Sequence, residues 1–580
     1  MAPYLDWLQS HWIWLSLVLL RFSLVFLPQQ GYIHPDEFFQ STEVVAGDVL
    51  NISVLRSWEF SAGLRSVPTI YFLSGPWFYL MRGISQLRTS YWAVVLPRLN
   101  ACLLSVVVDI AVACVCGLFC LESKNVLPIL ASSYIMFTYL TRTFSNSMET
   151  VVFSLLFMLV MKTVKDIQAN KESRETRKEE HDRYQRMSLE EFRNKHNADS
   201  AGCKHITDLS ILTFFWIGFL SALGLFVRPT FAAFSVGPIL WLIMTVLNAE
   251  DSVMSCLFAM TVGAFIPSLV MVLIDTQYYS GKTVLDIVSA FRQCVVTSEK
   301  VTECWEDFFK LFVVTPLNFI KYNTDPNNLS SHGRHPLYTH LVVNLPILFG
   351  PSVVIMLVEV KRLLLRQSPS LRCVLLSFVM VPVIILSMFP HQEPRFLIPV
   401  LPLVVLLCSS TLQSVPYRKL FFSLWCIFNI TCTLFYGVFH QGGVIPLLSY
   451  IEKHTHDPPA VFTHQDRLFF FHTYMPPRSL LLSNSSLEQI MDLQGSSMEK
   501  LVDDIRTQHS GDSYVVLPGT QLEEFSQQNI SFVVTKVFPL HLSMEDPPPL
   551  GIVRELWENF TGTSRKLSDL LSLYLIKLNN

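Results

Sequence analysis

Two adjacent carboxylates, Asp36 and Glu37, are the residues whose types and spacing most directly suggest chemistry. They follow His34 in the string GYIHPDEFFQSTEVVAGDVL, which comes directly after the first long apolar run. A carboxylate can act as a general base that takes a proton from an attacking hydroxyl, and a low-dielectric boundary raises its basicity. The same string fits a helix start, because Pro35 suits the first helical position and acidic side chains in the first turn favour the helix dipole. The two interpretations are compatible.

Cationic side chains recur at the expected ends of apolar segments. A phosphate leaves as an anion, so a reaction that releases one needs positive donors where the charge develops. A single arginine at such a place usually anchors a helix at the membrane interface, but several on one side of the membrane favour a shared anion. The candidates are Arg65, Arg142, Arg228 and the run His391, Gln392, Glu393, Pro394 and Arg395.

The cysteines give no sign of a metal site. Most of the 12 are single and lie in apolar runs, as Cys114, Cys116 and Cys120 do, with no histidine nearby at ligand spacing. They are interpreted as small core residues. Cys294 and Cys304 lie in a polar loop predicted to be lumenal, where a disulfide is allowed but cannot be inferred from sequence. No metal is predicted, because arginines can stabilise a phosphate without one.

The composition is that of a membrane protein. Of the 580 residues 51% are hydrophobic and only 15% are charged, against about 25% charged in soluble proteins. The net charge of -3 and the dispersed lysines and arginines argue against a nucleic-acid partner, so lipids are the expected partners.

Apolar stretches long enough to cross a bilayer recur as far as about residue 440. They predict an all-α polytopic membrane bundle of about 10–12 spans, in which the first apolar run is a retained span and not a signal peptide. The polar string TRTFSNSMET (141–150) interrupts one stretch and predicts a broken or re-entrant element there. The candidate spans are 12–28, 67–82, 99–121, 126–162, 209–228, 231–248, 254–274, 341–359, 371–389, 396–412 and 420–439.

The basic loops set the expected orientation. The highly charged, helix-forming loop 162–208 and the short loops at Lys361 and Arg418 should be cytosolic. The first loop (29–66), the loop 275–340, the turn at His391 and everything after His440 should then be lumenal. Glycosylation is expected at five sequons in the lumenal segments, while a sixth at Asn429 lies inside a span and should be silent. The five are Asn51, Asn328, Asn484, Asn529 and Asn559.

The chain changes character after about residue 440, so a boundary is predicted between a membrane module (1–440) and a lumenal domain (441–580). The short runs SYVVLPG and ISFVVTKVF are typical of strands and predict a small mixed α/β domain. A final membrane-hugging helix is expected at about 565–578. No repeat of 20 to 50 residues is visible, which argues against an inverted-repeat transporter.

Several strings together resemble the dolichyl-phosphate-mannose-dependent mannosyltransferases of the GT-C type. The resemblance covers about 12–443 and continues at 474–483; each string is weak alone and specific in combination. The HPDE form resembles the GPI-anchor branch, and the HQEPRF form is most similar to the enzymes that add the fourth, side-branch mannose. The strings are HPDEFFQ (34–40), WEF (58–60), LRS (64–66), RTFSNSMET (142–150), RPT (228–230), HQEPRFLIP (391–399) and YMPPRSLLLS (474–483).

This resemblance implies an α1,2-mannosyltransferase of the endoplasmic reticulum membrane. Mannose would pass with inversion from dolichyl-phosphate-mannose to the third mannose of a GPI-anchor precursor, on the lumenal side and without a cofactor. By the family pattern Asp36 is the first candidate base, with Glu37 as the alternative or as an orienting residue. The substrate-binding candidates are His34, Arg65, Arg142, Asn146, Arg228, His391, Glu393 and Arg395.

Other functions fit parts of the same pattern. An enzyme adding the third GPI mannose, or an N-glycan mannosyltransferase using the same donor, would share most of the strings. A polytopic lipid or solute transporter would also carry intramembrane charges and broken helices. A non-catalytic subunit is a further alternative, disfavoured by the intact acidic pair.

Overall fold

The computed structural model describes most of the chain, and the residues it describes form two compact units. Unit 1 comprises Met1–Val106, Pro128–Met148 and Pro416–Asn580, and unit 2 comprises Val107–Leu127 and Glu149–Val415. Each unit is described by itself. The described residues are 9–27, 29–186, 211–249, 253–296, 301–325, 328, 333–366, 370–456, 462–463, 465–483, 490–507, 511–548, 551 and 568–579.

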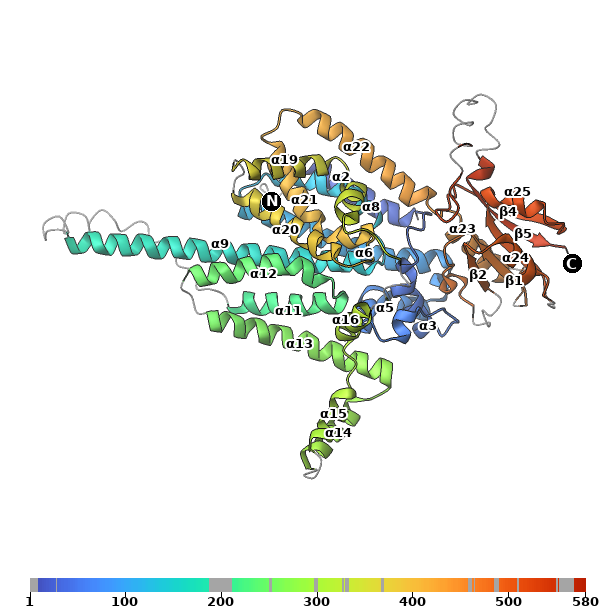
Figure 1. Ribbon diagram of the computed structural model, residues 1–580, viewed down its shortest axis with the longest axis horizontal. Helices are drawn as coiled ribbons and strands as arrows, with labels where there is room; N and C mark the ends of the chain where they lie inside the picture. Colours follow the sequence, from blue (N-terminus) through green and yellow to red (C-terminus); the bar gives the residue numbers. More distant parts are fainter. Residues whose placement is uncertain are drawn as a thin grey trace. The chain divides into compact units, whose positions relative to one another are not determined.

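Unit 1 holds the first helices of the chain and its C-terminal part (Figure 1). Its helical elements are α2 (Trp12–Phe26), η1 (Phe38–Thr42), α3 (Glu43–Leu50), α4 (Trp58–Ser61), α5 (Val67–Gly83), η2 (Ser85–Leu87), most of α6 (Ser90–Leu118), part of α7 (Ser123–Ala131), α8 (Tyr134–Thr138), α22 (Arg418–Leu434), η5 (Phe435–Phe439) and α23 (Val444–His456). The π-helical turn η1 follows the acidic pair directly, and such turns are frequent at functional sites.

Unit 2 is a helical bundle. It is built from nearly all of α9 (Ser145–Arg186), and from α11 (Ile211–Val227), α12 (Phe231–Asn248), α13 (Val253–Ser280), α14 (Val284–Val296), α15 (Val301–Lys310), α16 (Thr315–Thr324), η3 (His340–Asn344), α18 (Leu345–Phe349), α19 (Ser352–Leu364), α20 (Ser370–Ser387), η4 (Pro394–Val400) and α21 (Leu401–Leu412). Two glycines let α11 and α13 pack closely. A Cβ on Gly218 would lie 1.9 Å from the Met260 carbonyl, and one on Gly263 would lie 2.0 Å from the Phe215 carbonyl. Reciprocal small residues of this kind are typical of helix pairs in membranes.

The expected polytopic membrane bundle is confirmed. Among the described residues six helices have the length and composition needed to cross a membrane, and four shorter helices are also apolar. The expected number of about 10–12 spans stays a prediction. The candidate span at 67–82 forms α5 but does not belong to this set. The long helices are Ser90–Leu118, Ser145–Glu179, Phe231–Asn248, Val253–Ser280, Pro394–Leu412 and Arg418–Phe439, and the shorter ones are Trp12–Phe26, Ile211–Val227, His340–Phe349 and Leu371–Ser387.

The stretch 126–162 is broken as predicted. It forms α7, the short α8 and then α9, with the chain leaving the helical path at 139–144. Asn429 of α22 stabilises the broken element. Its Oδ1 accepts a hydrogen bond from the Tyr134 N–H, the first of α8, at 2.7 Å. An unpaired N–H there would be costly in a membrane. Asn429 is buried, which agrees with the expectation that its sequon is silent.

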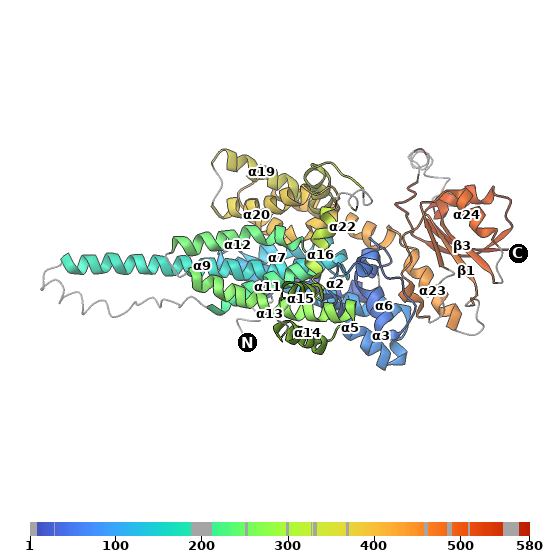
Figure 2. The ribbon, with the colours of Figure 1, turned by 60° about the horizontal axis from the view of Figure 1, so that its bottom comes forward.

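The charged loop was predicted to be helix-forming, and its first part is helical. α9 continues from the membrane span through Arg186. The remainder of the predicted loop, 187–208, lies outside the described residues. In Figures 1 and 2 this charged end of α9 extends beyond α12.

The C-terminal part contains the predicted mixed α/β fold. Five strands, β1 (Arg467–Phe471), β2 (Ile490–Gln494), β3 (Ser513–Pro518), β4 (Phe532–Pro539) and β5 (Ser572–Leu578), form one sheet in the order β2-β1-β3-β5-β4. β1 is parallel to β2 and β3, whereas β5 is antiparallel to β3 and β4. The short helices α24 (Met498–Ile505) and α25 (Leu522–Ser526) bury Leu501 and Phe525 in its core. Figure 2 shows α24 beside the strands.

The predicted final helix at 565–578 is wrong. Residues 572–578 form β5, which pairs with two strands, and residues 565–567 lie outside the described part. A continuous apolar run cannot be assigned to helix or strand by periodicity alone. Here the run forms a strand because the edges of β3 and β4 pair with it. The boundary at residue 440 stays a prediction.

Two predicted glycosylation sites, Asn51 and Asn529, are exposed and adopt left-handed backbone conformations. Asn328 is half-buried. Asn484 and Asn559 lie outside the described residues. Glycosylation of these five residues therefore stays a prediction.

Candidate functional site

In unit 1 Glu37 is clamped by two arginines. The side chain is 1% exposed. Arg98 of α6 donates from Nε to Oε1 at 2.8 Å, and Arg142 donates from a terminal nitrogen to Oε2 at 2.8 Å. Both arginines are buried and also donate to the chain before the acidic pair, Arg142 to the Gly31 carbonyl at 2.6 Å and Arg98 to the Gln29 carbonyl at 2.9 Å. The Glu37 clamp therefore fixes the whole turn from 29 to 37.

Asp36 has different surroundings although it is the adjacent residue. Its side chain is 23% exposed, and His34 Nδ1 lies 3.4 Å from Oδ1. The Asp36 N–H donates to that Nδ1 at 3.2 Å, so this ring nitrogen is the acceptor. Gln40 donates to Oδ2 from one turn further along. Of the two candidate bases, Asp36 is the more exposed.

A chain of hydrogen bonds leads from Asp36 to Arg65. Ser145, the first residue of α9, donates to Gln40 Oε1 at 2.8 Å, and Arg65 donates to Ser145 Oγ at 3.3 Å. Arg65 also donates to Glu59 Oε1 at 2.7 Å. Along this chain Arg65 donates to Ser145, Ser145 donates to Gln40, and Gln40 donates to Asp36. Such a chain holds the carboxylate in one orientation.

The C-terminal string resembling the family is attached to the first loop through Glu43. This buried carboxylate accepts the N–H groups of Arg478 and Ser479, each at 3.0 Å, and that of Leu55 at 3.2 Å. Burial raises the pKa of Glu43, and the hydrogen bonds from Ser479, Leu55 and Arg478 act in the opposite direction. Glu43 therefore joins separate chain segments. This contact holds the string YMPPRSLLLS (474–483) against the first loop, although the two are far apart in sequence.

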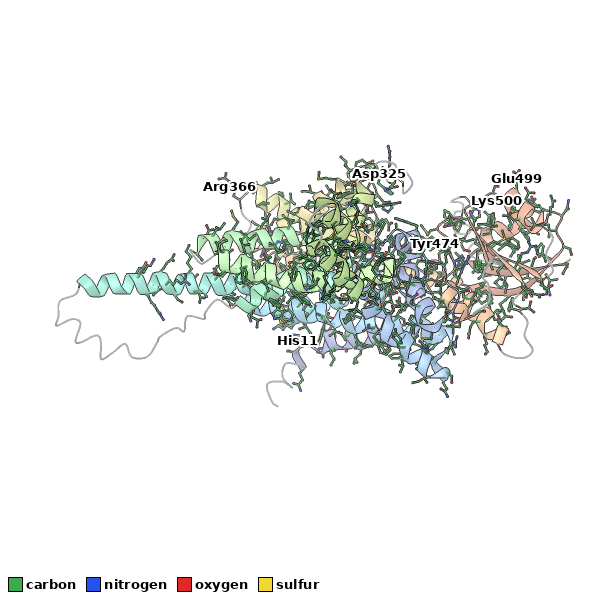
Figure 3. All side chains as sticks on the ribbon, turned by 90° about the horizontal axis from the view of Figure 1, so that it is seen from below. His11, Asp325, Arg366, Tyr474, Glu499 and Lys500 are labelled. Atoms are coloured by element: carbon green, nitrogen blue, oxygen red, sulfur yellow. A yellow bond between two sulfur atoms is a disulfide. The ribbon has the colours of Figure 1, made fainter. Side chains whose placement is uncertain are left out.

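Tyr474 brings the same string next to His34. The centre of its ring lies 6.2 Å from that of His34, 5.7 Å from that of Tyr32 and 5.6 Å from that of His440. In Figure 3 Tyr474 lies where the blue N-terminal segment meets the orange C-terminal segment. The C-terminal part of unit 1 therefore contributes the aromatic ring of Tyr474, which lies beside His34, and His34 in turn contacts Asp36.

Unit 2 gathers a second set of predicted residues in the HQEPR turn (391–395) between α20 and η4. His391 Nε2 lies 2.8 Å from Glu393 Oε1, and Arg395 donates to the same oxygen at 3.0 Å. Gln392 fixes the turn, since it donates to the Ser387 carbonyl at 3.0 Å and accepts the His340 N–H at 3.0 Å.

Arg228 shares an aromatic ring with this turn. The guanidinium carbons of Arg228 and Arg395 lie 5.3 Å and 5.7 Å from the centre of the Phe396 ring. Arg228 Nε lies 3.7 Å from Glu149 Oε2, and Thr230 donates to Glu149 Oε1 at 2.7 Å. Three predicted cations, Arg228, His391 and Arg395, thus converge around one ring with two carboxylates beside them.

In the structure the predicted cations contact different partners. Arg142 belongs to the Glu37 clamp and Arg65 to the chain that ends on Asp36, and both lie in unit 1, whereas Arg228, His391 and Arg395 lie in unit 2. Asn146 is buried near the start of α9. Among the described residues no group of three or more His, Cys, Asp or Glu is placed to hold a metal ion.

Several residues of these clusters were missed by the sequence analysis, among them Arg98, Gln40 and Glu149. Arg98 lies in the apolar helix α6, and a charge inside a span is itself a signal of function or of a buried partner. Gln40 ends the string HPDEFFQ, and Glu149 lies within RTFSNSMET. Nothing in their spacing indicates which partner each one takes.

The sequence model of the Alg9-like mannosyltransferase family matches residues 12–483. This chain belongs to the Alg9-like mannosyltransferase family. The matched range contains the Glu37 clamp, Asp36, the HQEPR turn and the Tyr474 string. Membership agrees with the resemblance drawn from the sequence strings.

Relatives of this mannosyltransferase are similar over most of its length. GPI alpha-1,2-mannosyltransferase 4 of Homo sapiens is 32% identical, over 98% of this chain and 93% of that protein. GPI mannosyltransferase 4 of Drosophila melanogaster is 30% identical, over 80% of this chain and 71% of that protein. GPI mannosyltransferase 4 of Debaryomyces hansenii is 28% identical, over 88% of this chain and 91% of that protein.

A solved structure shares the fold. The crystal structure of ArnT from Cupriavidus metallidurans, bound to undecaprenyl phosphate, aligns with a TM-score of 0.50 over 90% of this chain and 95% of that chain. The identity is 9%, so the likeness concerns the fold alone. It supports the GT-C-type architecture expected for this mannosyltransferase.

Proposed function

We propose that this mannosyltransferase moves mannose from dolichyl-phosphate-mannose to the third mannose of a GPI-anchor precursor. The product would be an α1,2-linked fourth mannose, formed with inversion at the anomeric carbon. The names of the relatives in human, fly and yeast support the GPI acceptor, and the human name also supports the linkage. The polyprenyl phosphate in the ArnT crystal is of the same chemical class as the carrier of the proposed donor.

The observation that carries the proposal is the contrast between Asp36 and Glu37. A base must accept a proton at an oxygen that substrate can approach, and it must be held in place while it does so. Asp36 meets both requirements through its partial exposure and its contacts with His34 and Gln40. Glu37 is buried between Arg98 and Arg142 and acts as an orienting residue.

In the proposed reaction the acceptor hydroxyl loses its proton to Asp36 while its oxygen bonds to the anomeric carbon of the donor. The bond from that carbon to the phosphate oxygen breaks on the opposite side, which inverts the configuration. Dolichyl phosphate leaves with the bonding electron pair. Arg228, Arg395 and His391 are the proposed groups for recognising phosphate, because guanidinium groups match phosphate geometry.

The proposed compartment is the lumen of the endoplasmic reticulum. Cys294 of α14 and Cys304 of α15 form a disulfide. Disulfides persist in oxidising compartments such as this lumen, so the pairing supports a lumenal position for the loop 275–340.

The proposal can be tested in cells that lack the fourth GPI mannose. Expression of the full chain should restore a four-mannose intermediate among GPI lipids labelled with radioactive mannose, and Asp36→Asn should not. Glu499→Gln, a matched carboxylate-to-amide change on the exposed helix α24, should restore it fully (Figure 3). Rescue of cells lacking the third mannose, with none of those lacking the fourth, would contradict the acceptor assignment.

A further inference from the structure

Helix α14 carries an apolar face that the described part of unit 2 leaves uncovered. Leu285 is 80% exposed, and Val288 is 50% exposed. Val284, Val288 and Val295 follow the spacing i, i+4 and i+11 and so share one side of the helix. Leu285 lies at the edge of that side, next to the exposed Arg292, whose long side chain can reach a polar layer from an apolar surface. Polar residues occupy another side, at Ser289 and Gln293. The apolar face consists of Val284, Leu285, Val288 and Val295.

This face is not a by-product of an open or unpacked hairpin. The Cys294–Cys304 disulfide closes the connection between α14 and α15. Inside the hairpin the ring of Phe291 lies 5.6 Å from that of Trp305 and 5.9 Å from that of Phe308. The hairpin therefore has its own packed aromatic core, and the apolar face of α14 lies outside that core.

Both ends of the hairpin are fixed at the end of one membrane span. α14 begins after a link of three residues from the end of α13, and such a link reaches at most about 10 Å. On the return, the Val313 N–H donates to Thr276 Oγ1 at 2.9 Å, and Thr315 donates to Asp275 Oδ2 at 3.0 Å. The hairpin must therefore leave and re-enter unit 2 where α13 meets the membrane boundary. Figure 1 shows α14 and α15 beyond that end of α13.

The outer surface of α13 is apolar and extends toward the start of the hairpin. Phe258 is 72% exposed and Phe265 is 62% exposed on this apolar span, as expected of side chains that face lipid. Beyond the hairpin, Leu317 and Ile320 of α16 are also about half exposed. The apolar face of α14 thus continues a lipid-facing surface at its membrane boundary.

We propose that the α14–α15 hairpin lies on the membrane surface, with the apolar face of α14 set into phospholipid at the boundary between head groups and acyl chains. Helices that lie in the interface combine one apolar face with a polar one, as α14 does. Tryptophan and other aromatic residues are enriched at this depth, and Trp305 provides one. The disulfide fixes the hairpin so that the lipid-facing side stays turned to the bilayer.

Photo-crosslinking in microsomes tests this placement. A photoreactive amino acid replaces Leu285, Gln293 or Phe258, one at a time, in the full-length chain, and the membranes contain phospholipid with a clickable acyl chain. Leu285 on the apolar face and Phe258 on the span should both label phospholipid, whereas Gln293 on the polar side of α14 should not. Labelling of a protein from Leu285, or no lipid label there while Phe258 is labelled, would overturn the proposal.

A second arm changes the face itself. With the photoreactive group in place of Val295, the double substitution Leu285→Glu and Val288→Glu should reduce phospholipid labelling several-fold, because charged side chains are disfavoured in lipid. Gln293→Glu adds a carboxylate to the polar side and should leave the labelling unchanged. Mobility on gels with and without reductant reports the disulfide and so the folded hairpin. Undiminished lipid labelling in the double variant, with the disulfide intact, would also reject the proposal.

Discussion

Asp36 and Glu37 differ in environment because adjacent helical residues point about 100° apart. One side chain is directed to Arg98 and Arg142, and the other toward His34 and Gln40. The sequence identifies the pair as the chemistry-bearing feature and names Asp36 first through resemblance. It does not show which of the two takes the arginines, because Arg98 lies in α6 and Arg142 in the break before α9, both distant in sequence.

Asp36→Asn should remove transfer and keep the fold. The amide has nearly the same shape but cannot accept a proton, so the rate should fall by at least about 10². Mannose transfer in detergent, with thermal unfolding measured in parallel, checks both parts. Near-normal transfer by a well-folded Asp36→Asn protein would assign the base elsewhere.

Glu37→Gln should instead destabilise the protein. Removing the charge leaves two buried arginines without their counter-ion, which typically costs about 3–5 kcal/mol. Glu122→Gln is the matched control, because Glu122 pairs with Lys124 at an exposed site where both side chains are more than half exposed, and such pairs contribute about 0–1 kcal/mol. Thermal unfolding of the two variants should differ clearly. Equal stability would mean that the Glu37 clamp is not a stabilising ion pair.

At the scale of elements, the HQEPR turn has a cation at the start of the 3-10 helix η4, where the helix dipole opposes it. Two anions are candidate partners for Arg395, the carboxylate of Glu393 and the phosphate of the proposed donor. Glu393 does contact Arg395, and it also contacts His391. Glu393 is thus shared between two cationic groups, while Glu149 lies beside Arg228.

Charge substitutions separate these partners. If Arg395 binds phosphate, Arg395→Lys should weaken transfer at low donor concentration while the protein stays folded, since the bidentate geometry is lost. If Arg395 serves mainly Glu393, Glu393→Gln and Arg395→Gln should each destabilise the protein and the double variant should recover much of the loss. Donor-concentration dependence and thermal unfolding are measured for all four variants. Unchanged donor dependence and unchanged maximal rate in Arg395→Gln would exclude the phosphate role.

The C-terminal sheet shows what local pattern can and cannot decide. The runs at 513–519 and 530–538 were correctly assigned to strands, because β-branched and aromatic residues dominate them. The run SLYLIKL at 572–578 has leucines at both helical and strand spacings. It becomes β5 because β3 and β4 each present an open edge to it. That choice depends on the tertiary neighbours and has no local signal.

At the scale of the whole molecule, the sequence predicted the membrane class and the broken element but not the grouping of the cations. Hydropathy reports which segments enter lipid, and a polar interruption such as 141–150 shows where a span ends. Arg65, Arg142, Arg228 and Arg395 look alike at this level, since each follows or precedes an apolar run. Their partners are set by helix packing, which separates Arg142 from Arg228 into different units.

Acid should destabilise the protein through His541. This buried side chain accepts the Gly443 N–H at 3.1 Å, and burial, followed by the neighbouring His440, lowers its pKa to about 3 from an ordinary 6.5. Protonation therefore favours the unfolded chain: the contribution is complete above pH 6.5 and is lost as the pH falls toward 3. At about pH 5 the loss from this one group is about 2 kcal/mol.

His541→Asn keeps an acceptor for Gly443 but does not titrate in this range. Its unfolding temperature should fall less between pH 7.5 and pH 5 than that of the wild type. His454→Asn on the half-buried side of α23 is the matched control and should behave as the wild type does. An identical pH response of His541→Asn and the wild type would show that the buried imidazole is not the acid-sensitive group.

The orientation of the whole chain can be tested at α9. This helix begins at Ser145, one turn before Glu149, and continues as a charged helix through Arg186. Its basic end should stay in the cytosol, because lysines and arginines near a span are retained there. A glycosylation acceptor inserted near Arg186 should therefore remain unmodified in microsomes. Asn51 and Asn529, both exposed, should be modified and should lose endoglycosidase-sensitive mass when changed to Gln.

Asn429 provides the internal control, since its side chain is buried and bound to the Tyr134 N–H, so Asn429→Gln should leave the glycan content unchanged. Ser145 donates to Gln40 Oε1, and Gln40 in turn donates to Asp36, so the first turn of α9 and Asp36 lie on the same side of the membrane. The Arg186 end lies a full membrane span away from that turn. Modification near Arg186 without modification of Asn51 would place Asp36 in the cytosol, where a lumenal mannose donor could not reach it.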